Sequence, residues 1–265
     1  MAKSIGIGQY INKESIIHAA DPRTKLFLTV VGIVSVMLLN NIYQYCFAFV
    51  SLAVYLVLAK ISFRTVLKSL KPILFLIIIT GLFNLFGTQG NVALHWGFIR
   101  ITYEGIFSMM SLVARLFLLV VCATMLTYTT TPSELTQGIE KAFGFLNKIK
   151  VPVSEFAIMM TIALRFIPTL LDEMDKIIKA QKSRGADFEN KNLFKKIKAY
   201  IPIIVPLIIN SVTRAVELAT AMEVRCYNSK NVRTKMRVLC YTKVDFALYS
   251  MVIIYFMIII ALMII

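Results

Sequence analysis

Long uncharged apolar runs alternate with short polar segments along the chain and predict membrane-spanning helices. Crossing the hydrocarbon core of a bilayer takes about 20 helical residues. Runs near this length predict five spans, at residues 25–40, 42–59, 72–87, 106–126 and 246–265. Pro72 stands at the favourable first position of the third helix, and Asn40-Asn41 predicts a tight turn between the first two.

The stretch between the fourth and fifth spans also has a helical pattern, but charged residues interrupt it. A helix start is predicted at residues 131–134, followed by helices over about 153–183 and 201–227. In the first of these long helices, apolar residues recur every three or four positions and charged residues take the other face, which is typical of an amphipathic helix. The apolar face includes Leu170, Met174 and Ile177.

These patterns predict an all-α polytopic membrane protein in three parts. Residues 1–126 form an N-terminal membrane domain. Residues 127–245 form a cytoplasmic segment of long amphipathic helices, and residues 246–265 form a C-terminal span.

Composition supports a membrane protein, and the distribution of charge gives its orientation. Of 265 residues, 58% are hydrophobic and 16% are charged, yet the net charge is +15. A basic soluble protein that binds nucleic acid would lack this apolar excess, so we expect no nucleic-acid partner. Four basic residues lie before the first span or at its first residue, four lie in loop 60–71, one in loop 87–105 and nineteen in segment 127–245. By the positive-inside rule, the N-terminus is cytoplasmic and the C-terminus external in the plasma membrane.

Two stretches of the cytoplasmic segment, residues 156–171 and 200–222, are apolar enough to raise an alternative in which both cross the bilayer. That arrangement would place the eight basic residues between positions 172 and 199 outside the cell, against the positive-inside rule. We therefore expect these helices to lie along the cytoplasmic face of the membrane or to dip into it.

Few residues inside the spans could carry chemistry. Beyond the boundary residue Lys25, the one charged side chain there is Arg115. An intramembrane charge is a functional candidate by default, and the structural alternative is that Arg115 snorkels to the interface or pairs with Glu104. The spans hold no Asp, Glu or His, which opposes a proton-coupled carrier. No pattern is typical of a catalytic site, a metal site or a phosphate-binding loop, so we expect no catalytic residue, cofactor or metal in this chain.

A short motif recurs at the ends of the two long helices. It reads Ala180-Gln181-Lys182-Ser183-Arg184-Gly185-Ala186 in the first and Ala221-Met222-Glu223-Val224-Arg225-Cys226-Tyr227 in the second. Each places one arginine at a helix C-terminus. Basic residues there complement the helix dipole by about 0.3–1 kcal/mol, which alone would account for them. The functional alternative is that each arginine docks on a partner, because its rigid fork of donors matches a carboxylate.

Together these features resemble the transmembrane coupling component, EcfT, of bacterial energy-coupling factor (ECF) transporters, which are ABC-type importers of vitamins and other micronutrients. The two motifs are similar to that family's paired X-Arg-Gly signatures. The stretches that resemble its N-terminus are Gly8-Gln9-Tyr10, Ser15-Ile16-Ile17-His18 and Asp21-Pro22-Arg23-Thr24-Lys25-Leu26. The second motif departs from the family because Cys226 stands where glycine is usual, and cysteine does not relax a left-handed turn as glycine does.

The resemblance implies a non-catalytic subunit of an ATP-driven importer. Two cytoplasmic ATPases, which bind ATP and Mg²⁺, would dock at Ser183-Arg184-Gly185 and at Val224-Arg225-Cys226. The residues implied to support the second site are Ala221, Met222, Glu223 and Tyr227. The face of Leu170, Met174 and Ile177 would contact a membrane-embedded substrate-binding subunit. The alternative function is a self-sufficient secondary carrier or an integral membrane enzyme.

Overall fold

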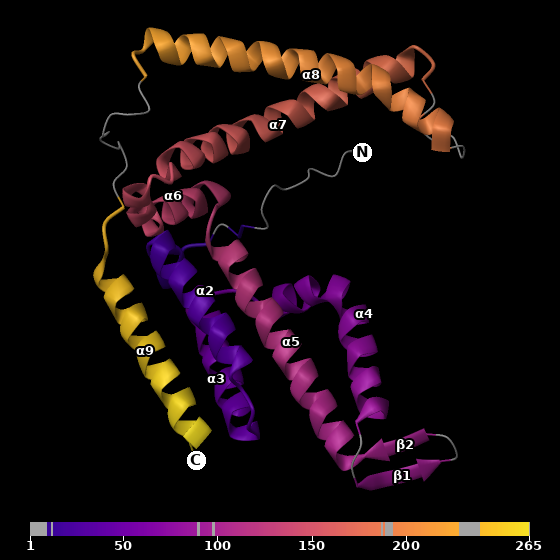
Figure 1. The fold of residues 1–265 in the computed structure, drawn as a ribbon, viewed down its shortest axis with the longest axis vertical. Coiled ribbons are helices and arrows are strands. Elements are labelled where there is room, and N and C mark those ends of the chain that lie inside the picture. Colours follow the sequence, from indigo (N-terminus) through magenta and orange to yellow (C-terminus); the bar gives the residue numbers. More distant parts are fainter. Residues whose placement is uncertain are drawn as a thin grey trace. The chain divides into compact units, whose positions relative to one another are not determined.

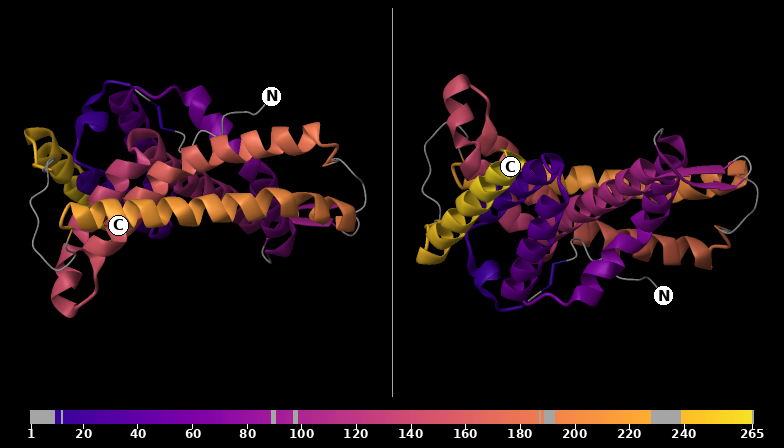
Figure 2. Two further views of the ribbon diagram at one scale, coloured as in Figure 1. Left: turned by 90° about the horizontal axis from the view of Figure 1, so that it is seen from above. Right: turned by 90° about the horizontal axis from the view of Figure 1, so that it is seen from below.

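The computed structural model describes residues 10–11, 13–88, 91–96, 99–186, 188, 193–227 and 239–264. The described chain is helical apart from one two-stranded sheet, so the predicted all-α polytopic class is confirmed. Its contacts separate it into two compact units, each drawn in Figures 1 and 2. The first unit is Met1–Ala142 with Leu239–Ile265, and the second is Phe143–Val238.

The first unit contains the helices that match the predicted spans. Its elements are α1 (Ile16–Ala19), α2 (Pro22–Met37), α3 (Ile42–Ala59), α4 (Phe63–Gly87), α5 (Tyr103–Thr129), α6 (Pro132–Ala142) and α9 (Lys243–Ile264). The start predicted for the third span at Pro72 is wrong, because α4 begins at Phe63 and continues through this proline. Hydropathy marks only the apolar part of a helix, and the first turns of α4 are basic and polar.

A small sheet that the sequence did not predict lies between α4 and α5. Strand β1 (Val92–Trp96) pairs antiparallel with β2 (Ile99–Thr102), with Val92 opposite Thr102. Thr102 then caps α5, because its hydroxyl accepts a hydrogen bond from the amide of Gly105 at 3.0 Å. Strands of four and five residues are too short to give a clear alternation in the sequence.

The second unit contains the 3₁₀ turn η1 (Gly144–Ile149) and two long helices, α7 (Val153–Ser183) and α8 (Leu193–Val224). The predicted range of α7 is confirmed, whereas α8 begins eight residues before the predicted start at Ile201. Packing groups α6 with the first unit, although the sequence places it in segment 127–245. The three parts predicted from the sequence are defined by their location in or beside the bilayer, whereas the two units are defined by contacts. The three-part division therefore stays a prediction.

Six helices in the described part of the chain are long and apolar enough to cross a bilayer. They are α3, α4, α5, α7, α8 and α9. Helix α2 has 16 residues, about 24 Å, which is shorter than the hydrocarbon core. The chain is thus a multi-pass membrane protein. The prediction that α7 and α8 follow the membrane surface is not decided by their length.

Two buried apolar clusters form the core of the first unit. One joins α1, α3, α4 and α5 and consists of Ile17, Leu56, Ala59, Ile61, Val66, Val121, Met125 and Tyr128. The other joins α2, α3, α5 and α9 and consists of Val36, Leu39, Tyr45, Ala48, Leu118 and Ile259. Ile259 lies in the second cluster, so α9 packs with the N-terminal helices there.

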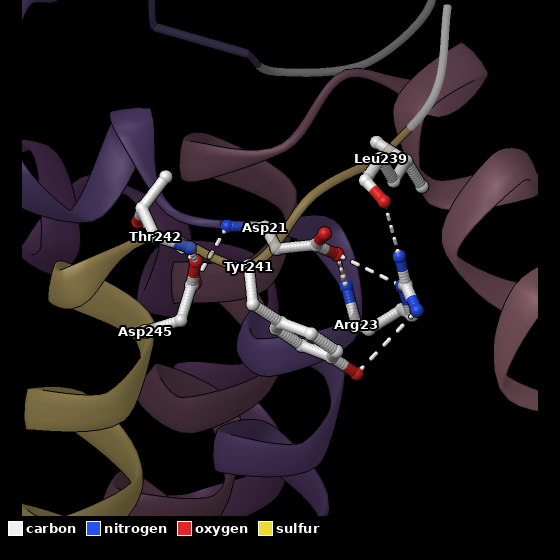
Figure 3. A network of polar contacts seen from close by, with 6 residues as sticks. All are labelled: Asp21, Arg23, Leu239, Tyr241, Thr242 and Asp245. Carbon is white, nitrogen blue, oxygen red and sulfur yellow. Dashed lines mark hydrogen bonds and ion pairs between the residues drawn. The ribbon is translucent and has the colours of Figure 1, made fainter.

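A buried carboxylate ties the beginning of α9 to the beginning of α2 (Figure 3). Asp245 is fully buried. One oxygen accepts a hydrogen bond from the amide of Asp21 at 2.8 Å, and the other accepts from the amide and hydroxyl of Thr242, each at 2.8 Å. The carboxylate of Asp245 thus accepts from one backbone amide at the start of α2 and one at the start of α9, where amides have no partner within the helix.

Arg23 adds a second link between the same two segments (Figure 3). Its Nε pairs with the carboxylate of Asp21 at 3.2 Å, and its Nη2 donates to the carbonyl of Leu239 at 3.0 Å. Its guanidinium also lies 4.6 Å from the ring centroid of Tyr241, within cation–π range. The Asp21-Pro22-Arg23 stretch of the N-terminal signature therefore holds the segment that leads into α9.

Lys25 is buried with 1% of its surface exposed, and it joins three helices. Its ammonium donates to the carbonyl of His18 at 2.8 Å and to the carbonyl of Thr129 at 3.0 Å. Thr129 is the last residue of α5, so the positive charge lies at the negative end of that helix dipole.

Helix α6 packs directly on the first turn of α2. Glu134 and Thr131 form a reciprocal cap at its start, each side chain accepting from the other residue's amide at 3.3 Å. Gly138 faces Pro22 so closely that an added Cβ would lie 2.9 Å from the proline Cβ. This close approach fixes α6 at the end of the helix bundle where α2 begins and α5 ends.

Arg115 does not pair with Glu104, so the pairing drawn from the sequence is wrong. Its Nη2 donates to the carbonyl of Leu39, just beyond the end of α2. Glu104 instead accepts from the side chain of Asn91 at 3.1 Å. Arg115 thus supplies a hydrogen-bond donor to a backbone carbonyl in the turn after α2.

Candidate functional site

The first arginine motif ends α7 in a left-handed turn. Arg184 is the C-cap, and Gly185 follows it with φ of 83°. The amide of Gly185 donates to the carbonyl of Lys182 at 3.0 Å, and the amide of Ala186 donates to that of Gln181 at 3.0 Å. This pair of bonds is the Schellman motif, which satisfies carbonyls that the helix end leaves free.

The second motif ends α8 with the same geometry. The amide of Cys226 donates to the carbonyl of Glu223 at 2.8 Å, and the amide of Tyr227 donates to that of Met222 at 2.9 Å. Cys226 has φ of 56°, so it takes the left-handed conformation of Gly185. This conformation costs a residue with a Cβ about 1–2 kcal/mol. The departure from glycine therefore strains the turn without changing its shape.

Both arginines project from these turns into solvent. Residues 183–185 and 224–226 are exposed, as are Ala221 and Glu223, whereas Met222 and Tyr227 are half-buried. Among the described residues, no ion pair or hydrogen bond involves the guanidinium of Arg184 or Arg225. Backbone amides already satisfy two carbonyls at each helix end, so the five donors of each guanidinium are free to bind a partner.

A polar contact fixes the place where α7 and α8 meet. Glu173 of α7 pairs with Arg214 of α8 at 3.2 Å, and the same carboxylate oxygen accepts from the side chain of Asn210 at 3.1 Å. Glu173 keeps 19% of its side chain exposed and Arg214 keeps 35%. The other oxygen of Glu173 is buried and has no hydrogen-bond partner in the described part of the chain. The contact is therefore a partly buried, incompletely satisfied node between two long helices.

The two motifs lie at matched distances from this node. Glu173 precedes Arg184 by eleven residues, and Arg214 precedes Arg225 by eleven residues. At 1.5 Å per residue, each arginine is about 16 Å along its helix from the ion pair. Figure 1 shows the end of α7 beside the start of α8 and the end of α8 at the opposite end of the pair. The two arginines thus end two arms of similar length that point away from one crossing.

The exposed apolar surface of this unit is wider than the sequence indicated. Leu170, Met174 and Ile177 are only half-exposed. A longer stripe of exposed side chains follows α8 at spacings of three and four residues: Ile201, Ile204, Val205, Ile208, Ile209, Val212 and Val216. On α7 the exposed apolar side chains are Phe156, Met159, Met160 and Ile167. The apolar run after position 200 is the sequence signal for this stripe.

The described residues include no group of three or more His, Cys, Asp or Glu side chains placed to hold a metal ion. Cys46, Cys122, Cys226 and Cys240 are free thiols. The features of the second unit that could bind a partner are the exposed guanidinium groups at its two helix ends and a broad apolar surface.

Comparison with known proteins agrees with this arrangement. The family described as "CbiQ: Cobalt transport protein" matches residues 13–238. An energy-coupling factor transporter transmembrane protein EcfT of Ruminiclostridium cellulolyticum is 50% identical over 245 residues, which cover 92% of each chain. Those of Clostridium kluyveri and Bacillus subtilis are 46% and 39% identical, over 93% and 92% of this chain and 92% and 93% of theirs. The chain therefore belongs to the CbiQ family, as a transmembrane component of an energy-coupling factor transporter.

Proposed function

We propose that the chain is the non-catalytic scaffold that couples ATP hydrolysis by two cytoplasmic ATPases to movement of a membrane-embedded subunit that binds a vitamin or another micronutrient. The observation that carries this proposal is the pair of identical arginine-capped helix ends on two arms that cross at one ion pair. ATP and Mg²⁺ bind to the ATPases, and this chain binds neither.

Each exposed arginine serves as a handle for one ATPase. The turns at Gly185 and Cys226 place Arg184 and Arg225 at the tips of their helices, where a groove in a partner can enclose them. A guanidinium enclosed in this way needs a carboxylate, because burying an unpaired charge is costly. Residues 183–185 and 224–226 form the two contacts, and the residues from Ala221 to Glu223 with Tyr227 support the second.

The ion pair between Glu173 and Arg214 is the pivot of the two arms. When the ATPase dimer closes on ATP, the tips at Arg184 and Arg225 are displaced relative to each other. Helices transmit such a displacement as rigid rods, so the movement has to be absorbed where α7 and α8 cross. The carboxylate of Glu173 permits small changes of angle there, because its second oxygen has no hydrogen-bond partner among the described residues.

The exposed apolar surface contacts the substrate-binding subunit and the bilayer. Leu170, Met174 and Ile177 belong to this surface together with the stripe on α8 from Ile201 to Val216. Apolar contacts are non-directional, and methionine side chains repack easily, so the partner can move across this surface. Substrate choice then resides in the partner.

The distribution of charge supports an N-terminus in the cytoplasm, an external C-terminus and helices α7 and α8 on the cytoplasmic side. Of 29 basic residues, nineteen lie in segment 127–245. Helices α7 and α8 are long enough to span, but spanning would carry eight basic residues from 172–199 to the outside.

Loss of either handle is expected to weaken assembly. Because removing one partner of a buried charge pair costs about 3–5 kcal/mol, Arg184→Ala or Arg225→Ala should weaken ATPase binding by roughly 100-fold or more. The two losses should be similar, since both turns have the same geometry. Co-purification of the reconstituted transporter and substrate uptake into proteoliposomes measure the effect.

One variant serves as the control for this experiment. Arg165→Ala removes an exposed arginine from the same helix as Arg184, outside the motif, and should retain binding. Wild-type binding and uptake in the Arg184/Arg225 double variant would refute the docking proposal. Substrate transport or turnover by the purified chain alone would favour the alternative of a self-sufficient carrier or membrane enzyme.

Breaking the pivot is expected to uncouple hydrolysis from transport. Glu173→Gln and Arg214→Gln should leave the ATPases bound and hydrolysing ATP but lower uptake per ATP several-fold, because the crossing no longer holds its angle. The exchanged pair Glu173→Arg with Arg214→Glu should recover part of the loss, and Glu217→Gln on the exposed face of α8 should have no effect. An unchanged ratio of uptake to hydrolysis in both single variants would contradict the pivot.

The orientation is tested by labelling. In a chain whose native cysteines are replaced, a cysteine at position 190, which lies outside the described residues, should not react with a membrane-impermeant maleimide applied to intact cells. A cysteine at Tyr43, exposed beside the Asn40-Asn41 turn, should react. Labelling of position 190 from outside would mean that α7 and α8 cross the bilayer.

A further inference from the structure

The turn between α6 and α7, residues 143–152, presents apolar side chains to solvent. Phe145 is 61% exposed and Ile149 is 70% exposed. Phe143 lies beside Phe145, with ring centroids 6.5 Å apart, and it is 45% exposed. Val151 at the end of the turn is 38% exposed. Four large apolar side chains thus project from ten residues that form no long helix.

Hydrogen bonds within the turn hold its backbone, so the exposed side chains belong to a defined conformation. The carbonyl of Asn147 accepts from the amide of Lys150 at 3.2 Å, and its side-chain oxygen accepts from the amide of Val153 at 3.0 Å. The amide of Val151 donates to the carbonyl of Leu146 at 3.2 Å. Several backbone amides of the turn are therefore paired within it, and the apolar side chains face outward.

Between Glu140 and Glu155 the charged side chains are all basic. Lys148 and Lys150 lie within the turn and are exposed, and the exposed Lys141 precedes it at the end of α6. No acidic residue occurs from position 141 to position 154. Aromatic and aliphatic side chains among lysines match the boundary of an anionic bilayer, where apolar groups enter the acyl region and lysines meet the phosphates.

The turn follows α6 directly along the chain. Phe143 comes immediately after Ala142, the last residue of α6. Helix α6 packs against Pro22 at the start of α2, through Gly138. The first residue of the turn is therefore bonded to a helix of the unit that contains most of the predicted spans.

We propose that the turn at residues 143–152 is a membrane anchor that inserts Phe145 and Ile149 into the headgroup boundary and binds anionic lipid through Lys148 and Lys150. Lipid contact accounts for both the apolar exposure and the uniform positive charge. The anchor fixes the beginning of α7 at the bilayer surface, while the other end of that helix carries Arg184. It depends on the membrane location of the chain and not on ATPase docking.

The experiment places a tryptophan in the turn of the full-length chain. Phe145→Trp is combined with Trp96→Phe, which leaves one tryptophan, and the protein is reconstituted into phosphatidylcholine vesicles with and without phosphatidylglycerol. Lipids brominated near the top of the acyl chains quench a fluorophore at that depth. We expect roughly twofold quenching in the anionic vesicles and less in the neutral ones, because anionic lipid draws the lysines to the surface.

Variants of the lysines separate lipid binding from simple exposure. Lys148→Gln with Lys150→Gln should lower quenching in anionic vesicles to the neutral level. The matched control, Lys176→Gln with Lys179→Gln, removes the same charge from the exposed face of α7 and should leave quenching unchanged. The anchor is refuted by equal quenching in both lipids or by no quenching at all. It is also refuted if the tryptophan is shielded from acrylamide only when the partner subunits are added, because the turn then binds protein.

Discussion

A charged side chain that leaves water must be met by a partner inside the protein, and this constraint organises the chain. Asp245 is fully buried and accepts three hydrogen bonds, which tie α9 to α2. Lys25 donates to carbonyls at the ends of two other helices, and Arg115 does the same beyond the end of α2. Glu173 and Arg214 meet at the crossing of the two long helices. Apolar contacts are non-directional and can form between many pairs of helices. The polar contacts are therefore what select the neighbouring helices in this chain.

Arg184 and Arg225 are the informative exceptions to this pattern. Both are exposed, and neither finds a partner in the described part of the chain, although each stands on a well-formed turn. The left-handed conformation of Cys226 costs about 1–2 kcal/mol. The favourable interaction of Arg225 with the helix dipole is worth about 0.3–1 kcal/mol, so the dipole alone does not explain this turn. The arms behind the two arginines end at a common ion pair. These features together favour two docking points on one lever over two unrelated surface charges.

Hydropathy and spacing predicted most of the helices, because an apolar run of sufficient length has few other structures available in a bilayer. They failed at helix starts: α4 and α8 extend into polar and basic turns that no apolar run marks. The motif spacing also placed both arginines at helix ends, but it did not indicate the left-handed turn at Cys226, because cysteine stands there in place of glycine. The sequence could not reveal the pairing of Asp245 with Asp21 or of Glu173 with Arg214, since such pairs join residues far apart along the chain and leave no periodic trace. The pairing of Arg115 was misjudged for the same reason.

The most direct test of the account is photo-crosslinking in the assembled transporter. A benzoylphenylalanine replaces Ser183 at one helix tip or Val224 at the other, and Val216 on the apolar stripe serves as the reference position. The account predicts that positions 183 and 224 each link to an ATPase subunit, whereas position 216 links to a membrane partner or to lipid. Links from both tips to the substrate-binding subunit, or a link from position 216 to an ATPase with none from the tips, would contradict it.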